Sequence, residues 1–339
     1  MRPEMRTLLR VLVAIPVLLV TAWWSLALYF AAPEPDWLKI TLAAAFFLGT
    51  VIILVWLRPF RFPLVIWAVA LGVILYWWST LVPTNDADWQ PDVARLAWGE
   101  VNGDRLTIHN LRNADYRTEQ DYTVRYEDRT YDLSKLRGLD LFMIYWGSPF
   151  IAHTIMSWQF DAGSPLAISI ETRKKVGQEY SAIEGFFKQY ELIYVVADER
   201  DVIRLRTNYR GEEVYLYRLK TPIPEARALL LDYVHSMNEL RDHPQFYNAL
   251  TDNCTTTIRR HVAHVDPNAP RFDWRLIVNG YGDELMYERG NVDTRMSFAE
   301  LRARSRINTK ARAADQDPTF SIRIREGVPN PRLLWPRPS

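Results

Sequence analysis

Residues 152–173, "AHTIMSWQFDAGSPLAISIETR", contain two apolar and β-branched runs on either side of the turn-forming sequence "DAGS". Such runs around a short turn predict a β-hairpin. A hairpin centred between Ala162 and Gly163 places residues 171–173 opposite position 153. We therefore expect His153 and Glu171 to lie side by side on neighbouring strands.

Further strands are expected on both sides of this hairpin, because other short apolar or alternating runs lie between turn residues. They are "DRLTIHNLR" (104–112), "YTVRYEDRTYDL" (122–133), "LDLFMIYW" (139–146), "ELIYVVAD" (191–198), "EVYLYRL" (213–219) and an Arg-rich "VIRLRTNYR" (202–210). The first half of this region is therefore predicted to form a sheet.

Helical patterns dominate the region that follows. Residues 222–244 begin with proline and an acidic residue and carry apolar residues at helical spacing. Helices are also expected within 251–265 and 297–307, and "FSIRIR" at 320–325 is interpreted as a last strand. Strands followed by helices predict an α+β domain over residues 95–339.

Three uncharged apolar segments precede this domain. About 20 apolar residues suffice to span a bilayer as a helix, and the first segment is too long for the apolar part of a signal peptide. We predict a three-helix membrane anchor at 1–83, followed by a linker at 84–94. The expected spans are Val11–Ala32, Ile40–Leu57 and Pro63–Val82.

The basic residues that flank these spans predict their orientation, because Lys and Arg stay on the cytoplasmic side. These residues are Arg2, Arg6, Arg10, Arg58 and Arg61, whereas the loop at 33–36 has none. We expect a multi-pass protein of the bacterial inner membrane with a cytoplasmic N-terminus and a periplasmic C-terminal domain. Its net charge of +1 offers no footprint for nucleic acid.

Cys254 is the only cysteine in the chain, and it lies where a helix is expected to begin. Asp252 is predicted to be the N-cap of this helix. The free N–H groups and dipole of a helix N-terminus favour a thiolate and can hold an oxyanion, so Asp252 and Asn253 are candidate residues of such a site. The alternative is a buried structural cysteine, since unpaired cysteine is commonly buried.

A nucleophilic thiol also needs a base. His235 and His243 are expected on the surface. His261 and His264 follow Cys254 by seven and ten residues, or roughly 10 to 15 Å of helix. We therefore expect no zinc site with Cys254 and interpret these two histidines as cations in the last helical turn.

His109 and His153 remain, and each is expected at the edge of a strand. His153 is preferred because it begins the hairpin strand. Glu171 is a candidate to orient its imidazole; the alternative is a surface carboxylate paired with Arg173. No metal and no cofactor are expected.

Several separate motifs resemble a known family. They are "RNADYR" (112–117), "YWGSPFIAHTIMSWQF" (145–160), "ISIETR" (168–173), "RLRTNYRGEEVYLYRL" (204–219) and "YNALTDNCTTT" (247–257). Over roughly residues 95–290 the chain is similar to the Lnb-type periplasmic domain. The order of a strand histidine, a polar residue on the next strand and a later "NC" also resembles the circularly permuted papain-like enzymes of NlpC/P60 type.

The resemblance implies a papain-like thiol-enzyme domain, with an antiparallel sheet packed on a helix that carries the cysteine. It implies acyl transfer through a thioester on Cys254, with His153 as base. The family member that gives the name transfers a fatty acyl chain onto a lipoprotein amino terminus. A phospholipid acyl donor, a lipoprotein acceptor and the membrane are therefore the expected partners.

One departure bears on the substrate: in that member the domain precedes the membrane helices, whereas here the three spans come first. A cell-wall amidase or peptidase and a non-enzymatic binding domain are the alternative functions. A set of arginines is expected to contact lipid phosphate or substrate, and for those within residues 202–210 the alternative is a solvated strand face. The set is Arg173, Arg204, Arg206 and Arg210.

Overall fold

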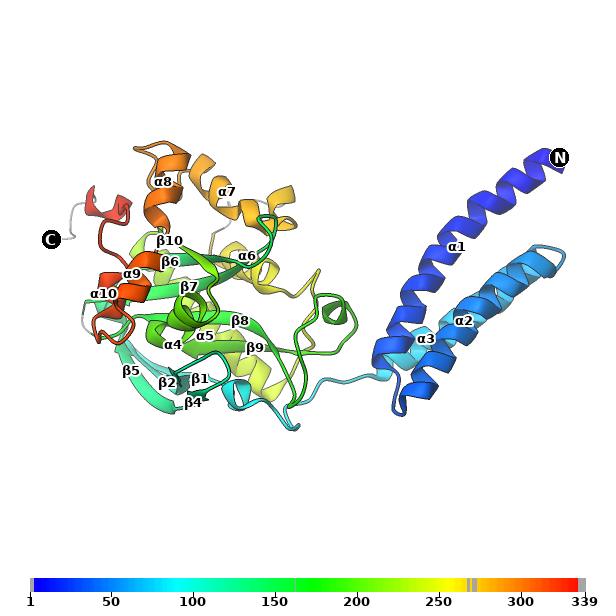
Figure 1. Cartoon of the computed structure of the whole chain (residues 1–339), viewed down its shortest axis with the longest axis horizontal. Coiled ribbons are helices and arrows are strands. Elements are labelled where there is room, and N and C mark those ends of the chain that lie inside the picture. Colours follow the sequence, from blue (N-terminus) through cyan, green and yellow to red (C-terminus); the bar gives the residue numbers. More distant parts are fainter. Residues whose placement is uncertain (1–2, 162, 267–268, 270–272, 335–339) are drawn as a thin grey trace. The chain divides into compact units, whose positions relative to one another are not determined.

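The computed structural model describes residues 3–161, 163–266, 269 and 273–334 (Figure 1). The chain forms two compact units. The first comprises Met1–Thr84 with Tyr180–Tyr190, and the second comprises Asn85–Glu179 with Glu191–Ser339.

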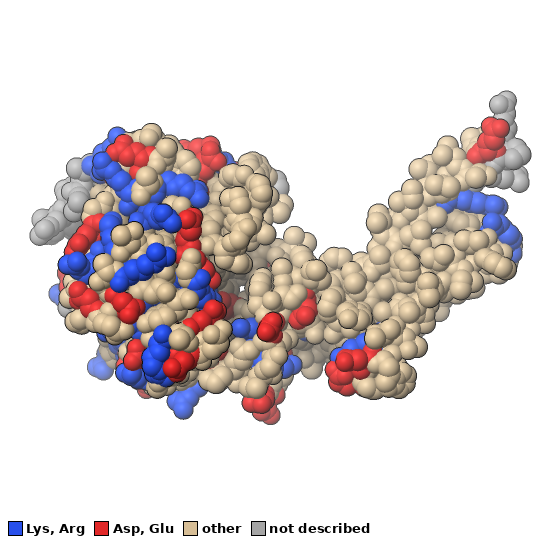
Figure 2. All heavy atoms as spheres, in the orientation of Figure 1, with Lys and Arg blue, Asp and Glu red and all other residues tan. Residues whose placement is uncertain are grey.

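Three helices of the first unit are long and apolar enough to cross a membrane, as predicted. They are α1 (Pro3–Ala31), α2 (Asp36–Trp56) and α3 (Arg61–Thr80). Large apolar side chains such as Trp56 and Tyr76 are exposed on them, and few charges interrupt their surface (Figure 2). Such a surface is stable only when lipid or another apolar medium covers it.

A loop distant in sequence also belongs to the first unit. Phe187 stacks on Phe30 of α1 at 5.3 Å between ring centroids. The Lys188 ammonium donates a 2.9 Å hydrogen bond to the carbonyl of Trp78 in α3 and lies 4.9 Å from the centre of its ring. The segment Tyr180–Tyr190 is thereby attached to the C-terminal ends of α1 and α3.

The second unit contains an eight-stranded sheet with the order β1-β2-β9-β8-β7-β6-β10, and β5 also pairs with β2. The strands are β1 (Trp98–Asn102), β2 (Arg105–Arg112), β5 (Tyr126–Asp132), β6 (Leu136–Tyr145), β7 (Ala152–Phe160), β8 (Leu166–Arg173), β9 (Glu191–Ala197) and β10 (Glu213–Arg218). A separate ribbon joins β3 (Asp115–Tyr116) and β4 (Tyr122–Thr123).

The sheet is mixed, so the expectation of a purely antiparallel sheet is wrong. Arg112 of β2 pairs in parallel with Ala197 of β9, whereas the other pairings are antiparallel. These two strands are far apart in the sequence. No tight turn therefore obliges them to run in opposite directions.

The predicted hairpin is confirmed, and its register lies one residue from the middle of the predicted range 171–173. Ile155 pairs with Ser169 and Trp158 pairs with Leu166, and the intervening pairs keep the same register. Continued by two residues, this register places 153 opposite 171. Ala162 of the turn lies outside the described residues.

Helices lie on both faces of the sheet. On one face, Trp158 of β7 donates a hydrogen bond to the carbonyl of Ala226 in α5 (Ile223–Asp242). On the other face, Ile155 belongs to a buried cluster with Val202 and Phe320. The remaining α-helices are α4 (Glu199–Arg204), α6 (Cys254–Val265), α7 (Gly282–Glu288), α8 (Phe298–Ser305), α9 (Asn308–Ala313) and α10 (Phe320–Arg323). The 3₁₀ turns are η1 (Pro91–Val93), η2 (Leu133–Lys135), η3 (Glu184–Phe186), η5 (Trp274–Leu276), η6 (Asn279–Tyr281) and η7 (Pro331–Leu334).

The helices expected at 222–244 and 297–307 are confirmed as α5 and α8, but two strand predictions are wrong. The Arg-rich stretch 202–210 forms the end of α4 and a π-helical turn, η4 (Leu205–Tyr209). Asp198 caps α4 by accepting a hydrogen bond from Arg200 N, which begins the helix there.

Residues 320–325 begin with helix α10 rather than forming a strand. Phe320 and Ile324 are both fully buried. Their spacing of four residues brings them to one face of a helix, whereas the alternation seen in the sequence suggested a strand.

Candidate active site

Cys254 is the first residue of α6, and Asn253 is its N-cap. The Asn253 side chain accepts a hydrogen bond from Thr256 N, and the Thr256 hydroxyl accepts one from Asn253 N, each at 3.0 Å. The prediction that Asp252 caps this helix is therefore wrong. A capping box needs a residue three positions before Thr256, and that residue is Asn253. Asp252 instead accepts hydrogen bonds from Arg260 and the Thr251 hydroxyl.

The Cys254 thiol is buried, and the His153 imidazole is the charged group that acts on it most strongly. The sulfur of Cys254 lies 3.9 Å from the Thr255 hydroxyl. Burial raises the pKa of the thiol, but the charge and hydrogen bond of His153, together with Thr154, outweigh burial and lower the pKa to about 7. Such a thiol is largely a thiolate just above neutral pH.

His153 is the second residue of β7, and groups on β8 hold its ring. Its Nε2 lies 2.7 Å from Ser169 Oγ and 3.2 Å from Glu171 Oε1. Burial lowers the pKa of His153, but the charge of Glu171 and the nearby thiolate of Cys254 raise it to about 9. Because Nε2 is engaged with β8, Nδ1 is the ring nitrogen left for the thiol.

Glu171 is held in turn by Arg206, which lies on η4. Arg206 Nη2 donates to Glu171 Oε1 at 2.8 Å, and its Nη1 donates to Glu212 at 3.1 Å. Burial raises the pKa of Glu171, but His153 and Arg206 keep this pKa well below its usual range. The alternative of a surface carboxylate paired with Arg173 is wrong.

These four side chains form a continuous array of alternating charge. Between about pH 7 and pH 9 it holds a thiolate, an imidazolium, a carboxylate and a guanidinium. An activated nucleophile with a base that is oriented by a third group requires side chains of these kinds in this order. Residues 122–280 match the family model of the Lnb N-terminal periplasmic domain.

The chain carries an Lnb N-terminal periplasmic domain. With the three apolar helices, this domain makes the chain a membrane protein with a periplasmic domain. Comparison with curated proteins and with solved structures found no match. Cys254, His153, Glu171 and Arg206 all lie inside the matched segment.

Three of the four arginines that were expected to contact lipid or solvent are buried and bind partners within the periplasmic domain. Arg173 is buried, donates to the carbonyls of Val93 and Ala94, and lies 4.2 Å from the centre of the Trp89 ring. Arg204 is buried and donates to Asp115.

Neither Arg173 nor Arg204 is therefore available to bind a phosphate group. The alternative expectation, a solvated strand face, is also wrong, because Arg204 is buried and lies in helix α4. Arg206 is buried as well, and its partners place it in the array around His153. The sequence did not predict that Arg206 binds Glu171, because the two residues are 35 positions apart in the chain. Arg210 is partly exposed beside Glu119 and stays a candidate contact.

The other histidines of the Lnb domain have separate partners. His109 stacks on Trp98 and binds Asp128, and His235 and His243 are exposed as predicted. His261 was expected to be a cation at the helix end. It is buried, and burial lowers its pKa although Asp232 opposes this effect, so that expectation is wrong.

Exposed apolar side chains lie in three segments, before β7, before α6 and in or directly after η5; we call them the apolar rim. They are Trp146, Phe150, Ile151, Leu250, Trp274 and Ile277. Asn279 joins the loops: its side chain makes two hydrogen bonds to the backbone of Ala152 and donates to the Thr255 hydroxyl at 2.6 Å. Ala152 and Thr255 are the direct neighbours of His153 and Cys254. The rim is therefore attached to the backbone beside the thiol.

Proposed function

We propose that the protein is a membrane-anchored Cys–His acyltransferase or hydrolase that forms a thioester on Cys254. The observation that carries this proposal is the thiol with a pKa near 7 beside an imidazole with a pKa near 9. Such a pair supplies a nucleophile and a proton donor at the same pH.

In the first step the Cys254 thiolate attacks the carbonyl carbon of an acyl ester. The oxygen of the resulting tetrahedral intermediate is stabilised by backbone N–H groups of the first turn of α6, which lack partners within the helix. Asn253 serves as cap and does not supply its amide group, since its Nδ2 donates to the carbonyl of Ala249. His153 then gives its proton to the leaving alcohol, and the acyl group remains on sulfur.

In the second step an amine or water attacks the thioester. His153 accepts the proton of the attacking group, and the thiolate leaves. Glu171 holds the imidazole in position and stabilises its charged form, while Arg206 keeps Glu171 ionised and in place.

For substrates, we propose a phospholipid acyl donor and a lipoprotein amino terminus as acceptor. The likeness to the Lnb family, the membrane anchor and the apolar rim support this choice. Residues such as Phe150 and Trp274 would lower the free energy of an acyl chain that leaves the bilayer. We also propose a permuted papain-like fold for the domain, because a strand histidine meets a cysteine at a helix N-terminus.

For localisation, we propose the bacterial inner membrane with a cytoplasmic N-terminus, as the flanking arginines indicate. A reporter enzyme fused after residue 339 is expected to be active only outside the cytoplasm. A fusion near Arg61 is expected to be active only inside. The opposite pattern would contradict this topology.

The activity is tested with the full-length protein in vesicles of phospholipid with an isotope-labelled acyl chain. We expect a hydroxylamine-labile acyl group on Cys254 and, after addition of a diacylated lipopeptide, transfer to its amino terminus, both read by mass spectrometry. Cys254→Ala and His153→Ala are expected to abolish transfer, whereas His235→Ala, a change at an exposed histidine, leaves it intact. Cleavage of cell-wall peptides without any need for phospholipid would instead favour the amidase alternative.

A further inference from the structure

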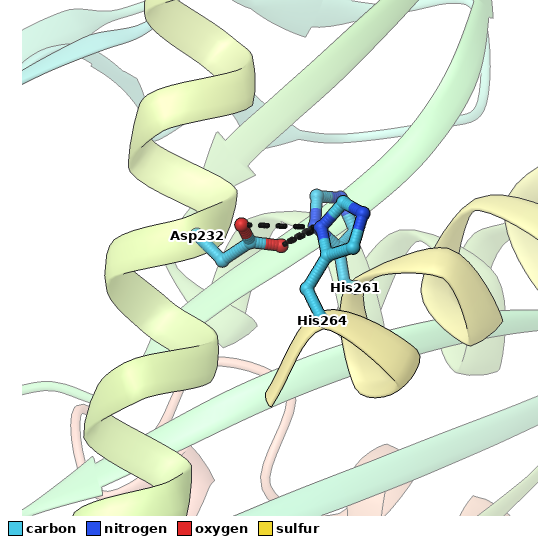
Figure 3. Close-up of side chains that lie close together, drawn as sticks. All are labelled: Asp232, His261 and His264. Atoms are coloured by element: carbon cyan, nitrogen blue, oxygen red, sulfur yellow. Dashed lines mark hydrogen bonds and ion pairs between the residues drawn. The ribbon is translucent and has the colours of Figure 1, made fainter. Parts of the chain in front are cut away.

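Two histidines and an aspartate meet between α5 and α6 (Figure 3). His261 Nδ1 lies 2.6 Å from Asp232 Oδ2, and His264 Nδ1 lies 3.2 Å from the same oxygen. His261 follows Cys254 by seven residues, which is about 10 Å along the helix. The cluster is therefore separate from the site built around the thiol.

The spacing on α6 directs both rings to one carboxylate. Residues three apart on a helix share a face, and Figure 3 shows both imidazoles turned toward Asp232 on α5. The one potential ligand atom that each of the three residues offers lies within 4.8 Å of the other two.

The His261 ring is held from two further sides. Its Nε2 lies 2.6 Å from the Tyr194 hydroxyl on β9, and the Tyr233 ring packs on it with centroids 4.0 Å apart. Buried metal-ligating histidines have such partners, which fix the ring orientation and decide which nitrogen is free.

We propose that Asp232, His261 and His264 bind a divalent transition-metal ion, for which Zn²⁺ is the best fit. Two imidazoles and one carboxylate are a common donor set for zinc with one position left open. A tetrahedral zinc ion about 2.0 to 2.1 Å from its ligands holds them about 3.3 Å apart. The distances of 2.6 and 3.2 Å to Asp232 Oδ2 need only small adjustments to meet this geometry.

Metal binding would determine which ring nitrogen of His261 carries the proton. A ring nitrogen that binds metal carries no proton, so His261 then carries its proton on Nε2 and donates it to the Tyr194 oxygen. If the metal-free ring carries its proton on Nδ1, toward Asp232, metal binding moves the proton to Nε2 and the ring stays neutral.

The ion has a structural consequence for the candidate active site. It joins α5 to α6, and α6 begins with Cys254. Zinc would therefore stabilise the position of the helix that presents the thiol, without taking part in the reaction of the thiol itself.

The test uses the full-length Cys254→Ala chain without a histidine tag, so that the thiol cannot bind metal. The purified protein is stripped with a chelator and titrated with Zn²⁺, with affinity measured by calorimetry and bound metal by mass spectrometry. We expect about one zinc ion per chain and a rise in melting temperature. Tyr194→Phe is expected to weaken zinc binding about 10- to 100-fold, as loss of an outer partner does.

His264→Gln is the decisive variant, because His264 is more than half exposed and its replacement spares the core. It is expected to abolish the uptake of zinc while the melting temperature in chelator stays unchanged. His235→Gln on α5 is the matched control and retains the ion. The proposal is overturned if the Cys254→Ala chain takes up no zinc, or if its uptake survives His264→Gln.

Discussion

Arg206 Nη2 lies 2.8 Å from Glu171 Oε1, the same oxygen that lies 3.2 Å from His153 Nε2. One carboxylate oxygen of Glu171 thus contacts both the guanidinium of Arg206 and the imidazolium of His153. Glu171 keeps its negative charge because of these two cations, and His153 keeps its proton mainly because of Glu171. We therefore expect the reactivity of the thiol to depend on this chain of charges as well as on the helix N-terminus.

The first prediction concerns the reactivity of Cys254 as a function of pH. The pKa of its thiol is lowered to about 7, so the thiolate forms as pH rises through 7. The rate of alkylation of the folded protein by iodoacetamide is expected to rise with a midpoint near pH 7 and to level off above it. His153→Ala should shift this midpoint upward. A midpoint at the ordinary thiol value of about 8.5 in the unmodified chain would contradict the array.

The second prediction separates the base from its orienting residue. His153→Ala is expected to reduce acyl transfer by about 10²- to 10⁴-fold, the usual contribution of a general base. Glu171→Gln should cost less, because the imidazole remains. It should also lower the pKa of His153, so that the alkaline limb of the pH–rate profile, near pH 9 in the unmodified chain, moves to lower pH. Glu300→Gln at an exposed position is the control; an unmoved limb in Glu171→Gln would exclude the orienting role.

The third prediction concerns Gly280, which lies against the loop before β7. A Cβ atom at this position would meet the Pro149 carbonyl oxygen at 2.1 Å, and backbone cannot yield as a flexible side chain does. Gly280→Ala is expected to destabilise the domain by about 1 to 3 kcal/mol and to slow alkylation of Cys254. Thermal unfolding and labelling rates measure the two effects.

Gly282→Ala is the matched control for this change. Its Cβ would meet only the Met143 side chain, with the terminal methyl at 3.3 Å and the sulfur at 3.8 Å, and that side chain can move. Equal stability of the two variants would show that the close approach of Gly280 to the loop has no importance.

The fourth prediction concerns a buried carboxylate distant in sequence from the candidate nucleophile. Asp140 is fully buried and accepts hydrogen bonds from Arg325 and Arg332. Burial raises the pKa of Asp140, but these arginines outweigh it and lower the pKa below the ordinary value. The stabilisation is therefore present above the unfolded-state pKa of about 3.9 and is lost as pH falls through the lower folded-state value.

Asp140→Asn is expected to cost about 3 to 5 kcal/mol at pH 7, because it leaves the buried guanidinium of Arg332 without its counter-charge, whereas Arg325 keeps Glu199. Denaturant unfolding at pH 7 measures this loss. Asp161→Asn, a change at a carboxylate whose side chain is largely exposed beside Arg137, should cost less than about 1 kcal/mol.

The sequence by itself determined the features that depend on local pattern. Uninterrupted apolar runs decided the three membrane-spanning helices, and turn chemistry with alternation decided the hairpin register that places Glu171 beside His153. These features are predictable because hydrophobic period and turn preference act over a few neighbouring residues.

Only the tertiary structure decided which distant residues meet. Arg206 belongs to a helical turn whose place beside Glu171 depends on how η4 packs against β8, and Asp232 meets His261 because α5 packs beside α6. The same holds for the parallel contact between β2 and β9. Contacts between distant elements depend on the packing of the whole core. A local sequence pattern therefore does not predict which distant residue a charged side chain will contact.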